Sequence, residues 1–217
     1  MRNILIPVVE GPTEKDFYDS SLNYLIRATG SSFFDEVKPS YIACGIGNFA
    51  KYIPGYLNDE YFQYAPQNDD SYYVAFCYDK DVFKRQNPPV NWKKVESKCR
   101  LKFEPNDLNR LHFIHIVADD CIENVFLCDI DGICKYLGRK PMKIPAGSNG
   151  VEKMEKVFRT VNKFYVKGGR VDGMVSCLNI AKILRKNCDM FYSFCRYLST
   201  DKHCDKCIDE YRKKQKL

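Results

Sequence analysis

A short and almost continuous apolar run near the start of the chain, Asn3 to Val9, does most to constrain the fold. Strands that are buried on both faces of a parallel sheet have this composition, with β-branched residues and no polar alternation. The run ends at Glu10-Gly11-Pro12, and a helix is expected from Glu14 to about Ala28, because apolar residues follow at roughly helical spacing. Thr13 is the expected N-cap of this helix. This segment therefore predicts a strand, a tight turn and a helix.

The same alternation continues along the chain. Further strands are expected at Val37 to Cys44, Tyr72 to Tyr78 and Leu111 to Ala118, with helices between them at Asn48 to Leu57 and Asn91 to Cys99. Strands that alternate with helices are typical of an α/β fold with parallel strands. We therefore expect a mostly parallel four-stranded sheet flanked by helices.

Beyond Asp119 and Asp120, which are expected to cap a helix, the pattern becomes helical. Helices are expected at Ile122 to Leu137, Val151 to Tyr165 and Val171 to Lys186, and a loop at Pro141 to Gly150. The last segment, Met190 to Leu217, is aromatic at first and then strongly charged. The chain is thus expected to comprise an α/β domain, residues 1–137, and a helical C-terminal extension, residues 138–217, packed on it.

Composition limits the classes of function. No apolar stretch approaches the roughly 20 residues of a membrane helix, and no signal peptide is recognisable, so we expect a cytoplasmic protein. The 11 cysteines are an odd number scattered through expected strands and helices, which does not suggest a disulfide framework. The net charge of +6 is compatible with a polyanionic partner but does not establish one.

Three carboxylates fall at the ends of expected strands: Glu10 after the first, and Asp79 and Asp81 after the strand that ends at Tyr78. Reactive groups of parallel α/β sheets gather at the carboxyl ends of the strands. Magnesium prefers oxygen ligands and is often held by a few carboxylates together with water and substrate phosphate. A lone D-x-D is common on solvated loops, and a Glu at a helix start is often only a favourable charge. Their order on successive strands predicts a divalent-metal site.

The sequence V-V-E-G-P-T-E-K-D-F, which begins at Val8, resembles the first Toprim motif. It has the E-G-x-T-E form of the OLD-family (overcoming lysogenization defect) nucleases and the related RloB-like defence proteins. The resemblance implies that Glu10 is catalytic, that Gly11 permits a sharp turn and that Glu14 matches the second acid of the motif. Glu14 is a candidate second ligand, and a first-turn helix acid is an equally good interpretation.

The rest of the resemblance covers the chain to about residue 137. C-Y-D-K-D matches the Toprim D-x-D motif and implies metal ligands at Asp79 and Asp81. D-C-I-E-N-V-F-L is similar to the acidic helix start of short Toprim-like proteins, which makes Glu123 a candidate ligand, although a simple helix N-terminal acid is the alternative. Topoisomerase and primase domains extend the second motif to a third Asp, where this chain has Phe83. The resemblance is thus to the compact nucleases.

This resemblance implies a Toprim-like (Rossmannoid) domain that hydrolyses DNA or RNA with Mg²⁺ or Mn²⁺, as the effector of an anti-phage defence system. The chain has no G-x-x-x-x-G-K-[ST] motif, so an OLD-like ATPase partner would be a separate chain. A non-cleaving Toprim-fold module that binds a nucleotide or a partner is the main alternative, and primase-type nucleotidyl transfer is a weaker one. Whether the protein is a homodimer stays open.

Basic residues lie around a second candidate feature, the Gly147-Ser148-Asn149-Gly150 loop and the helix after it. A phosphate chain could rest against such a loop and helix N-terminus, although a solvated lysine-rich face is the commoner interpretation. Lys153, one turn into the helix, is the candidate catalytic cation. The candidate nucleic-acid-binding residues are Lys143, Lys156, Lys167 and Arg170.

Two further groups of potential ligands have simpler explanations. Cys204 and Cys207 have the C-x-x-C spacing of a zinc site, but a second pair with proper spacing is missing, so zinc binding stays open. His112 and His115 lie in an expected strand, where a separation of three places them on opposite faces of the sheet. We expect them to be core or edge residues.

Overall fold

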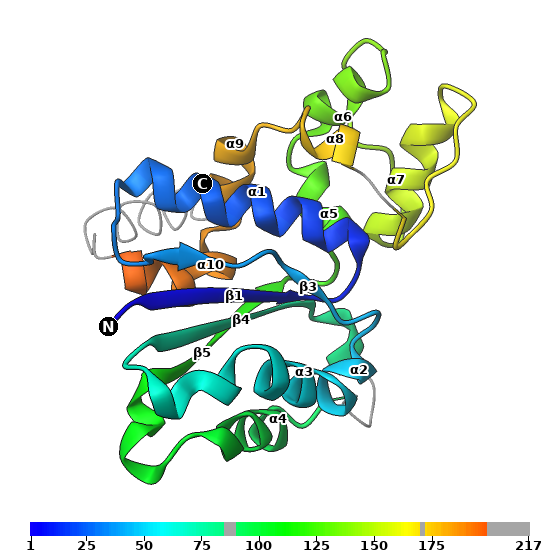
Figure 1. Cartoon of the computed structure of the whole chain (residues 1–217). Helices are drawn as coiled ribbons and strands as arrows, with labels where there is room; N and C mark the ends of the chain where they lie inside the picture. Colours follow the sequence, from blue (N-terminus) through cyan, green and yellow to red (C-terminus); the bar gives the residue numbers. More distant parts are fainter. Residues whose placement is uncertain (85–89, 170–171, 199–217) are drawn as a thin grey trace.

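The computed structural model describes residues 1–84, 90–169 and 172–198 of the chain. A parallel sheet lies at its centre and helices cover both faces (Figure 1), which confirms the predicted α/β architecture. None of the helices within these residues combines the length and the apolar character needed to cross a membrane.

The sheet is built around β4 (Ser71–Asp79), which pairs with β1 (Asn3–Val9) on one side and β5 (Leu111–Ala118) on the other. β2 (Glu36–Val37) and β3 (Tyr41–Ile42) pair with the far side of β1. All these pairs are parallel, and the strand order is β2-β1-β4-β5, with β3 also on β1. The carboxyl ends of β1, β4 and β5 therefore meet at one edge of the sheet.

One predicted strand is divided. Residues 37–44 were expected to form a single strand, but β2 and β3 are separated by Lys38-Pro39-Ser40. Proline has no backbone N–H to donate and restricts the residue before it, so a strand that contains it is usually confined to a sheet edge. The predicted four-stranded sheet therefore has five strands, two of them very short.

The helices form two layers, one on each face of the sheet (Figure 1). One face is covered by α1 (Pro12–Thr29), α5 (Ile122–Leu127), α6 (Ile130–Tyr136), α7 (Gly150–Arg159), α8 (Asp172–Val175), α9 (Ile180–Lys186) and α10 (Cys188–Cys195). The other is covered by α2 (Gly47–Lys51), α3 (Ile53–Glu60) and α4 (Trp92–Cys99). Short 3₁₀ helices are η1 (Phe62–Gln67), η2 (Asp81–Lys84), η3 (Arg100–Lys102), η4 (Pro105–Arg110) and η5 (Arg196–Leu198).

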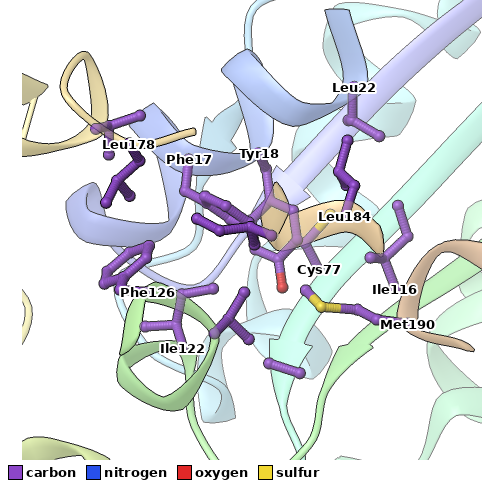
Figure 2. Packing of buried hydrophobic residues seen from close by; sticks show 14 of the residues in the cluster. Phe17, Tyr18, Leu22, Cys77, Ile116, Ile122, Phe126, Leu178, Leu184 and Met190 are labelled. Atoms are coloured by element: carbon purple, nitrogen blue, oxygen red, sulfur yellow. The ribbon is translucent and has the colours of Figure 1, made fainter. Parts of the chain in front are cut away.

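Each face of the sheet packs against its own hydrophobic cluster. Alternate residues of a strand point to opposite faces, so Leu5 faces the α1 layer and Ile6 the α3 layer. Figure 2 shows the first cluster, in which Phe17 and Tyr18 of α1 pack with Phe126 of α5. Complete burial of one such side chain contributes about 1.5–3 kcal/mol. These clusters hold α1 and α5 in place beside the carboxyl ends of the strands.

Two predicted helices are each divided into two shorter ones. The helix expected at residues 48–57 is divided into α2 and α3 at Tyr52, because Pro54 fits only the first turn of a new helix. The helix expected at residues 122–137 is divided into α5 and α6 at Cys128 and Asp129. Asp129 is buried there and accepts hydrogen bonds from the Asn179 backbone at 2.8 Å and the Lys182 amine at 2.7 Å.

Two later helices are also shorter than predicted. The helix expected at residues 151–165 ends as α7 at Arg159, and Asn162 has a left-handed backbone with φ 55°. The helix expected at residues 171–186 is divided into α8 and α9, because Asn179 caps the second segment by accepting a hydrogen bond from the Lys182 N–H at 3.0 Å. Local side-chain caps of this kind compete with a continuous helix.

Side chains from beyond residue 137 lie in the same hydrophobic cluster as α1, among them Met154, Met174, Ile183 and Phe191. The helices of the expected extension therefore share a core with the sheet, and a domain boundary at residue 137 stays a prediction. Cys204 and Cys207 lie outside the described residues, as does Arg170.

Candidate metal-binding site at the carboxyl edge of the sheet

Five carboxylates from different parts of the chain come together at the carboxyl edge of the sheet. Glu10 directly follows β1, and Asp79 ends β4, which pairs with β1 through Val9 and Cys77. The remaining carboxylates come from the turns and helix starts beside these two strands. They are Glu14 in the first turn of α1, Asp81 at the start of η2 and Glu123 in the first turn of α5. All five predicted metal ligands thus lie at this edge.

Three of these carboxylates are more deeply buried than ordinary acids. The exposed fraction is 0% for Glu123, 3% for Asp79 and 6% for Glu14. Acids of this kind are rarely buried without a partner, because removing a charge from water is costly. Among the described residues, one buried carboxylate oxygen of each acid has no hydrogen-bond partner. These atoms are Oε2 of Glu10, Glu14 and Glu123, and Oδ1 of Asp79 and Asp81.

The pKa values of Glu10, Glu14 and Asp79 are raised by burial and by the charges of neighbouring acids, because the carboxylates lie close together. Burial, followed by the charges of the surrounding acids, raises the pKa of Asp79 from 3.8 to about 9. Burial and the charges of Glu10 and Glu123 raise the pKa of Glu14 to about 7, although a backbone hydrogen bond lowers it. Burial also raises the pKa of Glu10, against hydrogen bonds from the backbone of Asp79 and Ile46. A cluster that resists full ionisation in this way is suited to a cation.

Glu123 is held by a residue far along the chain. The Tyr165 hydroxyl donates to its Oε1 at 2.9 Å, and both side chains are buried. Burial and the Glu123 carboxylate raise the pKa of Tyr165 well above its ordinary value, so the phenol remains a donor. This bond fixes one oxygen of Glu123 and leaves Oε2 without a partner among the described residues.

The segment that carries Tyr165 also brings a cation to the cluster. The Lys167 amine lies 4.0 Å from Oδ2 of Asp81. Burial lowers the pKa of Lys167, but the charges of Glu123, Asp81 and Asp79 outweigh this effect and raise it overall. Thr13 donates a hydrogen bond of 2.5 Å to the Gly169 carbonyl, which ties the same segment to the start of α1.

The E-G-x-T-E turn works differently from the prediction. The N-cap of α1 is Gly11, not Thr13, and Pro12 occupies the first helical turn. The backbone of Gly11 is extended, with φ −151°, so no sharp turn requires glycine there. Glycine instead leaves room for an acid, because a Cβ at this position would lie 2.9 Å from Oε2 of Glu14. The motif therefore places the Glu14 carboxylate close to the backbone beside Glu10.

The start of α5 also differs from the expected cap. Its N-cap is Cys121, one residue after the predicted Asp119 and Asp120, and no side chain caps it. Asp120 has a left-handed backbone, with φ 69°, and accepts a hydrogen bond from the Asn124 side chain at 3.1 Å. Its carbonyl accepts from the Asp81 N–H at 2.9 Å, which joins the turn after β4 to the turn after β5. This hydrogen bond helps to fix the turn that contains Asp79 and Asp81.

The donor set suits a hard divalent cation, because carboxylate oxygens are the ligands that Mg²⁺ and Mn²⁺ prefer. Within the described parts of the chain, however, no three His, Cys, Asp or Glu side chains are already grouped in a geometry that could hold a metal ion. Carboxylates that face one another repel without a cation between them. Metal binding would therefore require small side-chain movements that bring the free oxygens together.

The Gly147–Gly150 loop offers little to a phosphate. Asn149 caps α7 by accepting from the Glu152 N–H at 2.9 Å, and Glu152 accepts from the Ser148 N–H and hydroxyl, each at 2.7 Å. Hydrogen bonds from Lys156 and Ser148 lower the pKa of Glu152 to about 2. The donors that an anion would need at this helix start are therefore already engaged by an acid of the helix itself.

The predicted basic residues have different surroundings in the structure. Lys153 packs against this loop, since a Cβ on Gly147 would lie 2.9 Å from its Cγ. Lys156 forms an ion pair of 2.5 Å with Glu152, and Lys143 is exposed. Among the predicted cations that lie within the described residues, Lys167 is the one that contacts an acid of the cluster.

Comparison with models of protein families, with curated proteins and with solved structures gives no match. A Toprim-like identity therefore stays a prediction from the sequence motifs.

Sequence reasoning missed the residues that support the cluster. Tyr165 and Thr13 make contacts across 42 and 156 residues of chain, and no local pattern indicates them. The two histidines behave as predicted: His112 stacks on Tyr73, with ring centroids 4.4 Å apart, while His115 contacts Tyr78 at 3.2 Å on the opposite face. Burial lowers the pKa of both imidazoles.

Proposed function

We propose that this protein is a divalent-metal-dependent nuclease that hydrolyses phosphodiester bonds in DNA or RNA. The observation that carries the proposal is the set of five carboxylates at one sheet edge, each with a buried oxygen that lacks a hydrogen-bond partner among the described residues. A purely structural cluster would satisfy these oxygens with donors, because unpaired buried polar atoms cost about 1–3 kcal/mol each.

In this proposal Glu10, Asp79 and Asp81 would hold Mg²⁺ or Mn²⁺, with Glu14 and Glu123 as further ligands. When bound, the metal would supply Lewis-acid polarisation of a phosphoryl oxygen and activation of water. Glu10 is the ligand or general base of the reaction, since its carboxylate lies where a β strand meets the start of α1 and burial raises its pKa. A base with a raised pKa is better matched to neutral pH than an ordinary carboxylate.

The cations have positioning roles in the same proposal. Lys167 lies beside Asp81 and could contact the substrate phosphate without competing for the metal ligands. Lys153 lies near the start of α7, and its part in the reaction stays a prediction. The Toprim motif and the parallel sheet together support a Toprim-like nuclease related to the OLD and RloB-like defence proteins. A role in anti-phage defence, in the cytoplasm and with a separate ATPase chain, is proposed on that resemblance alone.

Glu10→Gln is the sharpest test. We expect the variant to lose cleavage of plasmid, single-stranded DNA and RNA by at least about 100-fold in the presence of Mg²⁺ or Mn²⁺, because a general base contributes that much or more. Glu60→Gln, on the exposed side of α3, is the matched control and should keep full activity. Both variants should unfold at a denaturant concentration no lower than that of the original protein.

Full activity of Glu10→Gln would refute the assignment of the site. Binding of Mg²⁺ and nucleic acid by the original protein with no cleavage under any of these conditions would favour the alternative, a non-cleaving module that uses the same cluster to bind a nucleotide or a partner.

A further inference from the structure

A second feature of the carboxyl edge is an open cleft of about 640 Å³ beside the acidic cluster. Cavities that bind small molecules commonly have volumes of about 300–1,000 Å³. The cleft lies between the turn after β4, the start of α4 and the junction of α9 with α10. Its lining includes Tyr78, Lys80, Phe83, Trp92, Asp119 and Lys186.

The cleft and the acidic cluster share one turn of the chain. Asp79 and Asp81 belong to the cluster, whereas the residues that alternate with them, Tyr78 and Lys80, line the cleft. Neighbouring residues along the chain have Cα atoms about 3.8 Å apart. A nucleic-acid strand with one phosphate at the cluster would therefore have its next nucleotide within reach of the cleft.

One wall of the cleft is aromatic. The Trp92 ring lies 4.6 Å from the Tyr78 ring and 6.3 Å from the Phe83 ring, with interplanar angles of 30° and 29°. Trp92 and Phe83 are only partly buried, so their rings are accessible at the cleft. Nearly parallel aromatic rings of this kind provide a surface on which a nucleobase can stack.

Charged side chains also line the cleft. Lys80 and Lys186 provide positive charge; the Lys80 amine forms an ion pair of 3.5 Å with Asp119, and the Lys80 side chain is 62% exposed. Asp119 and Asp189 provide acceptors, and the Asp119 side chain is 92% exposed. Carboxylates repel phosphate but accept hydrogen bonds from the exocyclic amino group of a base, as from N4 of cytosine. A mixture of aromatic rings, acceptors and cations fits a whole nucleotide better than it fits an isolated phosphate or an apolar ligand.

We infer that this cleft binds an unpaired nucleobase of a single-stranded nucleic acid, next to the phosphodiester bond placed at the acidic cluster. The base stacks on Trp92 and Phe83, and its phosphate lies toward Lys80. This inference deepens the proposed nuclease function, because it makes the substrate a strand with accessible, unstacked bases. A paired base cannot enter the cleft without leaving its duplex.

Trp92 is also the reporter for the test, since it is the only tryptophan of the chain. The full-length protein is titrated in a chelating buffer, where no cleavage occurs, with a short deoxycytidine strand and in parallel with a cytidine RNA strand. At least one should change the Trp92 fluorescence saturably. The same sugar–phosphate chain without bases, and the duplex form, should bind more weakly by roughly 5- to 150-fold, the range that follows from loss of one stacked base.

Phe83→Ala removes part of the stacking surface and keeps the reporter. We expect it to weaken binding of the base-bearing strand by roughly 5- to 150-fold and to leave binding of the base-free chain unchanged. Tyr64→Ala, in η1 and with Tyr64 54% exposed, is the matched control and should bind like the original protein.

Equal affinity for the base-bearing and base-free chains, an unchanged affinity in Phe83→Ala, or binding without a change in Trp92 fluorescence would each overturn the inference. This assay needs neither metal nor cleavage. Its failure would therefore not refute the nuclease proposal, which Glu10→Gln tests separately. Conversely, a protein that binds as expected but never cleaves would retain the base-binding cleft and lose the proposed reaction.

Discussion

Replacing Asp79 with Asn should stabilise the metal-free protein, even though it removes a proposed metal ligand. The folded protein raises the pKa of Asp79 from 3.8 to about 9, so the folded state binds a proton at neutral pH that the unfolded chain has released. An acid with a raised folded pKa therefore makes stability fall as pH rises between the two values. Neutral pH lies about 3 units above the ordinary pKa, and each unit is worth about 1.36 kcal/mol, which gives a cost of about 4 kcal/mol.

Asparagine resembles the protonated acid in shape and does not ionise in either state, so Asp79→Asn avoids this cost. We expect a gain in the free energy of unfolding of about 4 kcal/mol at pH 7, and almost none near pH 4, where the original side chain is protonated in the folded state and half-protonated in the unfolded state. For a chain of this size the gain at pH 7 corresponds to roughly 8–16 °C in the unfolding temperature.

Urea unfolding of both proteins in a chelating buffer, repeated from pH 4 to pH 8, measures this difference. Asp59→Asn, on the exposed side of α3, is the control and should change the free energy of unfolding by less than about 0.5 kcal/mol at any pH. A difference for Asp79→Asn that stays constant with pH, or a loss of stability at pH 7, would refute the argument that burial raises the pKa of Asp79.

Three further predictions concern the surroundings of the site and the core. Mg²⁺ at a free concentration of 100 times its dissociation constant should raise the free energy of unfolding by about 2.7 kcal/mol; calorimetry or thermal unfolding that shows no rise would count against a metal site. Tyr165→Phe removes the donor to the buried Glu123 carboxylate and should cost about 1–3 kcal/mol in urea unfolding, whereas an unchanged midpoint would mean that the bond contributes little. Gly132→Ala should cost about 1–3 kcal/mol, because the new Cβ would lie 2.8 Å from the Cys177 carbonyl oxygen; an unaffected unfolding temperature would contradict this packing.

The strands and the acids at their ends could be read from the sequence because both depend on local patterns. Residues 3–9 and 111–118 form strands with the predicted bounds, since continuous apolar runs of this length bury well in a parallel sheet. Topology then places the residues after each strand at one edge without further information. That is why Glu10 and Asp79 could be predicted to lie together, although nothing in the sequence specifies their separation.

The errors arose where tertiary contacts override local preference. The helical pattern of residues 122–137 continues through Asp129, but the chain turns there because that carboxylate is satisfied by Lys182 and Asn179 from a distant segment. Lys167 was only one of several basic residues in the sequence. It is distinguished by a loop whose position depends on the Thr13–Gly169 bond, which no periodicity indicates.

The interrupted strand at the far edge of the sheet has a consequence for how the protein behaves among copies of itself. The free edge formed by β2 and β3 offers two residues at a time for pairing, with Pro39 between them, so a neighbouring chain cannot extend a continuous ladder along it. At the opposite edge, the Ser193 hydroxyl of α10 donates to the His115 carbonyl of β5 at 2.6 Å and occupies an acceptor that an incoming strand would need. Both borders of this strongly apolar sheet are thus poor templates for pairing with a strand of another chain.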